Sequence, residues 1–449
     1  MSSRRTVIAI VAGCLALACV CMAVLAVVGA VAYLGASSQQ SGIPLPFVPT
    51  PTPAATQTSA EMTAAMDQIE QQVIGIRGLP ASRPVDRQLM TSAELRDYNL
   101  KEFEKTYSRD QAKDDTVSLA AFGLLDPSFK LYDFYVDLYS EDILGFYDDE
   151  VGKLFIITDR GRLDAVERNT FAHEFQHALQ DQNYGIEAMG LSDEGWKKDS
   201  ERAAGVQALI EGEATLLEGQ WRDKDFTQSD WNDYNSNAYA NPNSAYFRAP
   251  AYLQKDFYFP YNQGYLFVKR LYDRGGWAEV DKAFKNPPVS TEQILHPEKY
   301  DAGEAPQIVA TTVLTDTLGS GWRQVDSNVM GEWFTSLVLE QSISEKDAAT
   351  AAAGWGGDHY TVSYNESANQ TAVVWQTAWD TSADAEEFVD AFKNYGDARF
   401  GAKAQTGNGS LCWATSTVNS CLYFTSQSAL WVFAPDAATR EKVEKAAGH

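Results

Sequence analysis

Basic residues are scarce in this chain of 449 residues, which has 36 lysines and arginines against 61 aspartates and glutamates. The formal net charge of −25 would repel both the phosphate backbone of a nucleic acid and the headgroups of anionic lipids. We therefore expect no nucleic-acid partner. The sequence also lacks any repeat of fixed period, which excludes solenoids and propellers.

Cysteines are equally few, with five in the whole chain. Three of them, Cys14, Cys19 and Cys21, lie in an apolar run near the amino terminus, where thiols behave as small apolar groups. Cys412 and Cys421 remain, in a stretch that alternates like two strands of a hairpin. We predict that these two form a disulfide in an oxidising compartment; the alternative is a pair of buried thiols.

Charged residues are absent from residues 6–34. This run exceeds both the roughly 20 residues that span a bilayer and the roughly 7–15 apolar residues of a cleavable signal. Arg4 and Arg5 precede it and no basic residue follows before Arg77, so the positive-inside rule leaves residues 1–5 in the cytoplasm. We predict a single-pass cell-membrane protein with a transmembrane anchor at 6–34 and an extracytoplasmic working part.

Residues 11–14 offer an alternative, because they are similar to the cleavage box of a lipoprotein. Cleavage there would leave a second apolar run, from Cys14 to Leu34, without a role. We therefore expect an uncleaved anchor.

The segment after the anchor, residues 35–60, is rich in Ser, Gln, Pro and Thr, and its prolines favour an extended, semi-rigid linker. The remaining chain is long and apolar enough to bury a substantial core. We expect two folded domains: a larger, catalytic domain at 61–345 and a smaller α+β domain at 346–449.

The larger domain should combine helices with a short β-hairpin. Residues 143–158 contain two β-favouring runs on either side of the turn-rich stretch 148–152. From about Gly354 the pattern is strand, strand, helix, cysteine hairpin, strand and helix, which predicts a small α+β module. The predicted fold class is therefore α+β.

The strongest motif is HExxH, which is formed by His173, Glu174 and His177. Side chains four positions apart project from the same face of a helix, so the two imidazoles can converge on one ion with Glu174 beside it. Zinc accepts mixed nitrogen and oxygen ligands, so we predict a Zn²⁺ cofactor. The alternative is a structural pair of histidines, but apolar neighbours such as Phe171 and Phe175 argue against a polar surface patch.

A catalytic zinc site needs a third protein ligand and a fourth position for water. The helical pattern over 199–221 contains Glu211 and Glu213, whose side chains point about 200° apart on a helix. We take Glu211 as the third ligand and Glu213 as the alternative. The carboxylate that does not bind zinc would orient an imidazole or face solvent.

These motifs resemble those of the gluzincin metallopeptidases, especially the peptidase-MA-like branch, in which HExxH precedes a helix containing Glu-Gly-x-Ala. The resemblance covers roughly residues 143–277. It implies a zincin-like catalytic domain with His173, His177 and Glu211 as metal ligands. Thr215 stands where some gluzincins have an aspartate, four positions after the third ligand.

Two further segments extend the resemblance. Residues 258–268 form an aromatic helical pattern, and residues 287–300 are similar to a segment of bacterial membrane-anchored surface proteins with the same zinc motif. Tyr261, Tyr265 and His296 are candidate donors to an oxyanion. Core packing explains the tyrosines equally well and a structural role is favoured for His296, so this role stays unassigned.

We therefore predict a membrane-anchored, extracytoplasmic zinc metallopeptidase that cleaves polypeptides, with Glu174 as general base and then general acid. Two alternatives stay open. One is a non-catalytic surface protein in which zinc joins two helices, and the other is an amidase that acts on cell-wall peptides.

Overall fold

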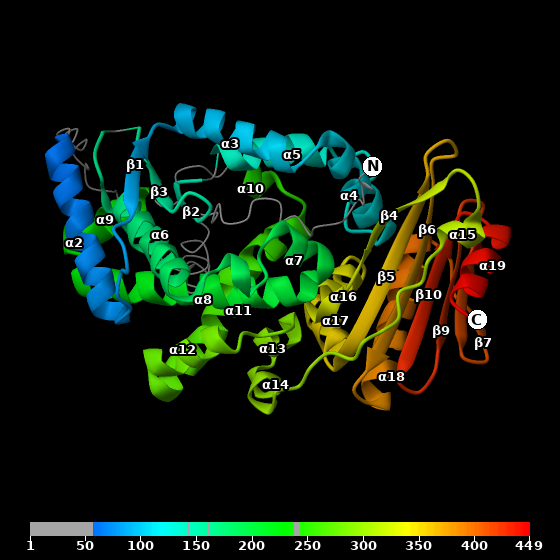
Figure 1. The fold of residues 1–449 in the computed structure, drawn as a ribbon. Helices are drawn as coiled ribbons and strands as arrows, with labels where there is room; N and C mark the ends of the chain where they lie inside the picture. Colours follow the sequence, from blue (N-terminus) through cyan, green and yellow to red (C-terminus); the bar gives the residue numbers. More distant parts are fainter. Residues whose placement is uncertain (1–56, 142, 160, 238–242) are drawn as a thin grey trace, which may run out of the picture.

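The computed structural model describes residues 57–141, 143–159, 161–237 and 243–449. The described chain combines many helices with two sheets, so the predicted α+β class is confirmed. Figure 1 shows a three-stranded sheet among helices at one end of the molecule and a seven-stranded sheet at the other.

The predicted transmembrane helix needs a correction. No helix in the described ranges is both long enough and apolar enough to cross a bilayer. The two longest of them, α8 (Ser200–Asp225) and α11 (Ala251–Gly275), carry several charged side chains each, which explains the result. The segment 6–34, where the anchor was predicted, and the cytoplasmic residues 1–5 lie outside the described residues, as does most of the linker at 35–60. The fold is therefore α+β with no membrane helix among the described residues.

The amino-terminal part of the described chain is mainly helical. Its elements are α2 (Ser59–Arg77), β1 (Asp86–Met90), α3 (Ser92–Thr106), α4 (Arg109–Ala121), α5 (Leu131–Glu141), β2 (Gly145–Asp148), β3 (Lys153–Ile157), α6 (Ala165–Tyr184), η1 (Glu187–Met189), α7 (Asp193–Lys198), α8, α9 (Gln228–Asn237), α10 (Ala245–Arg248), α11, α12 (Trp277–Lys285), α13 (Thr291–Leu295) and α14 (Pro297–Ala302). β2 and β3 form the antiparallel hairpin predicted at 143–158. β1 adds a parallel strand on the other side of β3.

Helices α8 and α11 approach each other closely at two glycines. A Cβ atom on Gly212 of α8 would lie 2.2 Å from the Gly264 backbone, and one on Gly264 of α11 would lie 2.1 Å from the carbonyl oxygen of Ala208. Only glycine permits this separation of the two backbones. The contact fixes the position of α8, and with it Glu211 and Glu213, against α11.

The carboxy-terminal part contains the larger sheet. Its elements are α15 (Thr315–Leu318), β4 (Trp322–Asn328), α16 (Gly331–Glu340), α17 (Glu345–Ala352), β5 (Trp355–Asn365), β6 (Gln370–Trp379), α18 (Ser382–Phe400), β7 (Gln405–Gly407), β8 (Ser410–Ala414), β9 (Asn419–Phe424), β10 (Ser428–Ala434) and α19 (Ala437–Ala446). The strand order is β4-β5-β6-β10-β9-β8-β7, and all neighbours are antiparallel. The predicted domain boundary at residue 346 falls between β4 and β5, so the sheet takes strands from both sides of it.

Both faces of the seven-stranded sheet are covered. Trp375 of β6 and Trp431 of β10 pair in register and pack against Phe392 of α18. Their neighbours Val374 and Val432 point to the opposite face, where they join a core with α15 and α19. Because successive residues alternate between two apolar layers, the sheet is stabilised from both sides.

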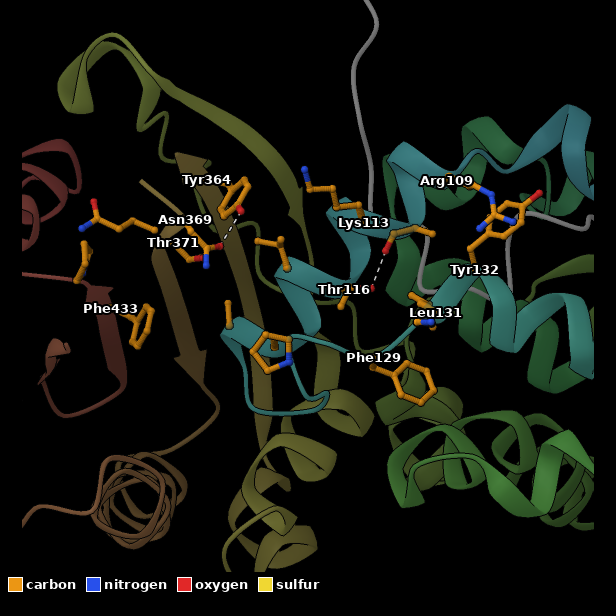
Figure 2. Close-up of a pocket in the computed structure, with 18 of the residues that line it drawn as sticks. Arg109, Lys113, Thr116, Phe129, Leu131, Tyr132, Tyr364, Asn369, Thr371 and Phe433 are labelled. Atoms are coloured by element: carbon orange, nitrogen blue, oxygen red, sulfur yellow. Dashed lines mark hydrogen bonds between the residues drawn. The ribbon is translucent and has the colours of Figure 1, made fainter. Parts of the chain in front are cut away.

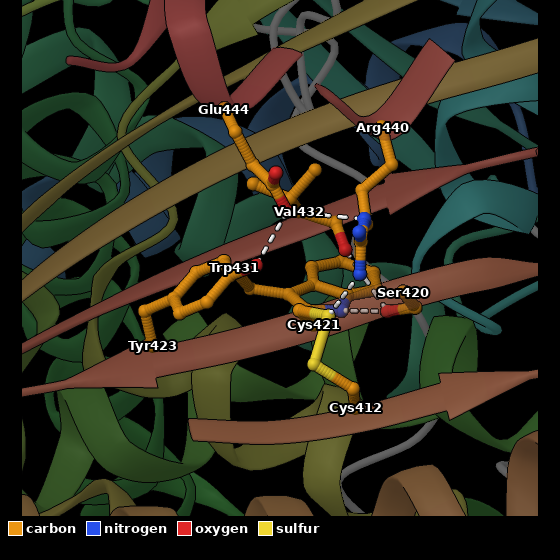
Figure 3. Close-up of a disulfide and its surroundings, with 8 residues drawn as sticks. All are labelled: Cys412, Ser420, Cys421, Tyr423, Trp431, Val432, Arg440 and Glu444. Carbon is orange, nitrogen blue, oxygen red and sulfur yellow. Dashed lines mark hydrogen bonds and ion pairs between the residues drawn. A yellow bond between two sulfur atoms is a disulfide. The ribbon is translucent and has the colours of Figure 1, made fainter. Parts of the chain in front are cut away.

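The predicted disulfide between Cys412 and Cys421 is present, and it links β8 to β9 (Figure 3). Arg440 on α19 reaches over the sheet and donates to Cys421 Sγ at 2.9 Å. The same arginine pairs with Glu444 at 3.1 Å, and Glu444 accepts a hydrogen bond from Tyr423 on β9. The last helix is thereby tied to the disulfide-bonded strands.

Replacing both cysteines with serine should lower the free energy of unfolding by about 2–3 kcal/mol, because the unfolded chain is no longer restrained by the short loop. Guanidinium unfolding of the two proteins measures this difference. Reducing the wild type should give the stability of the double variant, whereas the variant should not respond to reductant. Equal stability of the oxidised wild type and the variant would contradict this expectation.

Asp115 on α4 is fully buried near the sheet. Burial raises the pKa of this carboxyl well above its usual range; the hydrogen bond from Tyr107, 2.6 Å from Oδ2, opposes the increase, and Asp326 on β4 adds to it. The folded protein therefore keeps a proton on Asp115 at a pH where the unfolded chain, with the ordinary pKa of 3.8, has released it.

Because the folded state binds this proton more tightly, the stability that Asp115 contributes is present at low pH and is lost as pH rises above about 4. Asp115→Asn cannot ionise, so its stability relative to the wild type should rise by up to about 1.4 kcal/mol per pH unit. Urea unfolding of both proteins from pH 5 to pH 8 tests the expectation, and exposed Asp110→Asn on the same helix is the control. Parallel profiles for wild type and Asp115→Asn would show that the prediction is wrong.

Candidate metal centre

The HExxH motif lies in the middle of α6. This helix begins after Asp164, which occupies the N-cap position without a side-chain capping hydrogen bond. The His173 and His177 rings project from the same side, with their centroids 4.7 Å apart. Both side chains are buried, with 1% and 0% exposed.

Glu211 on α8 reaches both imidazoles. Its Oε2 atom lies 3.3 Å from His173 Nε2 and 3.4 Å from His177 Nε2. Nitrogen and oxygen ligands that bind zinc tetrahedrally at their usual bond lengths of about 2.0–2.1 Å stand about 3.3 Å from one another. The three side chains are therefore spaced as ligands of one zinc ion, and Glu211, not Glu213, is the carboxylate that the structure brings to the histidines.

One buried ring nitrogen of this cluster, His177 Nε2, lacks a hydrogen-bond partner among the described residues. Buried polar atoms are almost always paired, and a cation between His177 and Glu211 would satisfy this one. The donor set and this atom both fit a zinc ion.

The electrostatics of the cluster also suit a cation. Burial opposes ionisation of Glu211, but His177 and His173 hold the pKa of its carboxyl far below the usual range. Burial likewise opposes protonation of His173, but hydrogen bonds with Glu211 and Glu218 raise the pKa of His173 to about 10. The carboxylates thus draw positive charge to the point where the three side chains meet.

Glu218, which sequence analysis did not identify, orients His173. Its Oε2 atom lies 3.2 Å from His173 Nδ1 and also accepts a hydrogen bond from Asn169. Arg222 donates to Glu218 Oε1 at 2.9 Å. Glu218 stands seven residues after Glu211, two helical turns along the same face of α8, and this spacing was the available signal.

His177 is oriented by a chain of buried polar groups that leads to α2. His177 Nδ1 lies 2.7 Å from Gln180 Oε1, and Gln180 Nε2 donates to Glu213 Oε2 at 2.5 Å and to the Ile210 carbonyl oxygen at 2.9 Å. Glu213 in turn pairs with buried Arg77. Because both neighbours of Gln180 Nε2 are hydrogen-bond acceptors, the amide nitrogen must point toward them and Oε1 must face His177. Gln180 Oε1 therefore accepts a proton from His177 Nδ1. In this tautomer, His177 Nε2 keeps a lone pair with which it could bind a metal.

Glu174 is held by the neighbouring hairpin. The Tyr147 backbone N–H of β2 donates to Glu174 Oε2 at 2.9 Å, and the Glu174 side chain is 0% exposed. The contact positions the carboxylate from outside α6. Glu174 also lies close enough to His173 for its charge to contribute to the raised pKa of that imidazole.

The three candidate oxyanion donors occupy different surroundings. The buried Tyr261 ring has its centroid 6.2 Å from that of His173. Tyr265 packs on the core formed by α8, α11 and α12. His296 Nε2 lies 2.8 Å from Glu332 Oε1 on α16. The structure therefore places Tyr261 next to His173, a candidate metal ligand, and pairs His296 with Glu332.

A second group of acidic side chains, Glu292, Glu304 and Asp380, also lies close enough to share a cation. The ammonium group of Lys299 already supplies the positive charge, since its Nζ atom donates to all three carboxylates. We assign no metal to this cluster.

Residues 317–444 match one family model. It is described as a domain of unknown function (DUF8575) and covers the seven-stranded sheet but none of the metal-ligand candidates. No curated protein matches the chain, and no solved structure does.

Replacing Glu218 with Gln should weaken zinc binding by about 10- to 100-fold, because a neutral amide holds the His173 imidazole less firmly and makes it a poorer donor. Competition with a chromogenic chelator measures the affinity. Asp223→Asn, an exposed change on the same helix, is the matched control. Equal zinc affinity in Glu218→Gln and the wild type would contradict the role of Glu218.

Proposed function

We propose that this protein is a zinc-dependent hydrolase that cleaves peptide bonds, with His173, His177 and Glu211 as metal ligands. The main support for this proposal is that Glu211 Oε2 lies 3.3 Å from His173 Nε2 and 3.4 Å from His177 Nε2. The resemblance of the motifs to gluzincin metallopeptidases supports the same chemistry. The disulfide supports work in an oxidising compartment.

A bound zinc ion would supply Lewis acidity that polarises the substrate carbonyl and lowers the pKa of water from 15.7 toward about 7. Glu174 accepts the proton released as water attacks the peptide carbonyl carbon. It then delivers this proton to the amide nitrogen, whose bond to the carbonyl carbon breaks. The Tyr147 N–H holds the carboxylate in position through both steps. We assign the oxyanion to the side of the site that Tyr261 lines.

One observation favours a second candidate function, a zinc ion that only joins α6 to α8. His173, Glu174, His177 and Glu211 are each between 0% and 3% exposed, whereas a peptide must reach the metal to be cleaved. A structural zinc needs no buried proton acceptor, however, and the placement of Glu174 is the reason we prefer the hydrolase.

Incubation of the full chain with a peptide library and, separately, with cell-wall stem peptides tests the proposal. Mass spectrometry should detect new amino termini, a chelator should abolish them, and added zinc should restore them. The productive arm also distinguishes a peptidase from a cell-wall amidase. A chain that binds zinc but cleaves neither set overturns the hydrolase and favours the structural zinc.

A further inference from the structure

A cavity of about 920 Å³ lies between the amino-terminal helices and the seven-stranded sheet (Figure 2). None of its described lining residues belongs to α6 or α8, the helices that carry the candidate metal ligands. One wall comes from α4 and the start of α5. The other comes from β5, β6 and β10, with Tyr364, Thr371 and Phe433 among the lining residues. Its size falls in the range of about 300–1,000 Å³ of small-molecule sites, which are frequent where two parts of a chain meet.

Helix α4 forms the floor of the cavity, and its side chains there are small, which leaves the volume above them free. Ala112, Thr116 and Ala120 line it at intervals of four residues, along one face of the helix. The Thr116 hydroxyl donates to the Ala112 carbonyl oxygen of its own helix at 2.7 Å. Because the Thr116 hydroxyl is already hydrogen-bonded within α4, the floor presents mainly methyl groups to a ligand.

The lining is positively charged in a strongly acidic protein. Arg109, Lys113 and Lys130 line the cavity, with Asp133 as the one acidic side chain among its described lining residues. Arg109 pairs with Asp133, and Lys113 pairs with Glu366 outside the lining. Lys130 is exposed and makes no ion pair or side-chain hydrogen bond with any described residue. Such a local reversal of charge attracts an anion.

Apolar rings stand beside these cations. Phe129, Tyr132 and Phe433 line the cavity, and the Arg109 guanidinium lies 4.1 Å from the centre of the Tyr132 ring. Aromatic walls favour an apolar ligand body, whereas the lysine ammonium groups favour an anionic head. The two properties together select a ligand that has both.

We propose that this cavity binds a small organic anion in which one carboxylate or sulfonate is joined to an aromatic or acyl body. The anionic head pairs with Lys130, the cation of the lining that no described carboxylate neutralises, and the body lies over the small side chains of α4 against Phe129 and Phe433. The site is independent of the metal centre. It also gives the part of the chain matched by the family of unknown function a ligand-binding wall.

The test is a fluorescence titration of the full chain with 8-anilinonaphthalene-1-sulfonate, followed by displacement with decanoate. We expect saturable binding of one probe per chain that weakens with added salt. Ala120→Phe fills the floor, and Lys130→Glu reverses the charge of the unpaired lysine. Each should raise the dissociation constant by roughly tenfold or more.

Lys285→Glu, at an exposed lysine of α12 outside the cavity, is the matched control and should bind like the wild type. Because Lys130 is exposed, Lys130→Glu keeps the test decisive if Ala120→Phe fails to fold. Absence of saturable binding, or binding that neither folded cavity variant changes, overturns the proposal. Displacement by decanoate indicates an acyl ligand, and failure of decanoate to compete indicates an aromatic one.

Discussion

Glu174→Gln should reduce kcat/KM for peptide cleavage by about 10²- to 10⁴-fold, the range that one positioned general acid–base group contributes. The amide of glutamine keeps the volume of the side chain and can accept the Tyr147 N–H, so α6 and the three ligand side chains should stay in place. It cannot accept the proton of the attacking water. Zinc content should therefore be that of the wild type while turnover is lost, as measured by metal analysis and by the peptide assay on the same samples.

The control for this variant is Glu150→Gln, an equally conservative change at an exposed position of the same hairpin that holds Glu174. It should cleave at the wild-type rate. Wild-type activity in Glu174→Gln would rule out the proposed proton transfer. Loss of zinc from Glu174→Gln would instead assign the carboxylate to metal binding.

Arg77→Met should destabilise the protein by about 3–5 kcal/mol, because it leaves the buried Glu213 carboxylate without its cation. The same change should weaken zinc binding, since Glu213 fixes the Gln180 amide that orients His177. Guanidinium unfolding and chelator competition measure the two effects. Arg77 also pairs with Asp281 of α12 at 2.6 Å, and the loss of this second ion pair adds to the destabilisation.

Two comparisons separate this network from general damage to the fold. Arg83→Met breaks an exposed ion pair with Asp181 of α6 and should cost at most about 1 kcal/mol. Adding Glu213→Gln to Arg77→Met removes the stranded charge, so the double variant should be more stable than Arg77→Met alone. A loss in Arg77→Met no larger than that in Arg83→Met would contradict the role of the buried pair.

The sequence predicted those features of the site that depend on local spacing. His173 and His177 share a helix face because they are four residues apart, and the β2–β3 hairpin follows from two β-favouring runs around a turn. Glu218 could have been found by the same periodicity, since it follows Glu211 by two turns. These relations require only the geometry of one element.

Relations between distant elements could not be predicted in this way. The pairing of Arg77 with Glu213 depends on how α2 packs against α8, and no spacing within either helix specifies it. The addition of β4 to the seven-stranded sheet also results from tertiary packing, because β4 and β5 are separated by two helices. The cavity over Ala112 and Ala120 likewise exists only when α4 lies against the sheet.

Metal analysis of the purified full chain after dialysis against metal-free buffer is the most direct test of the proposed zinc centre. The proposed geometry predicts about one zinc per wild-type chain and none in Glu211→Ala or His177→Ala. A wild-type chain that retains no zinc and takes up none when zinc is added would contradict it, as would variants that still hold a full equivalent.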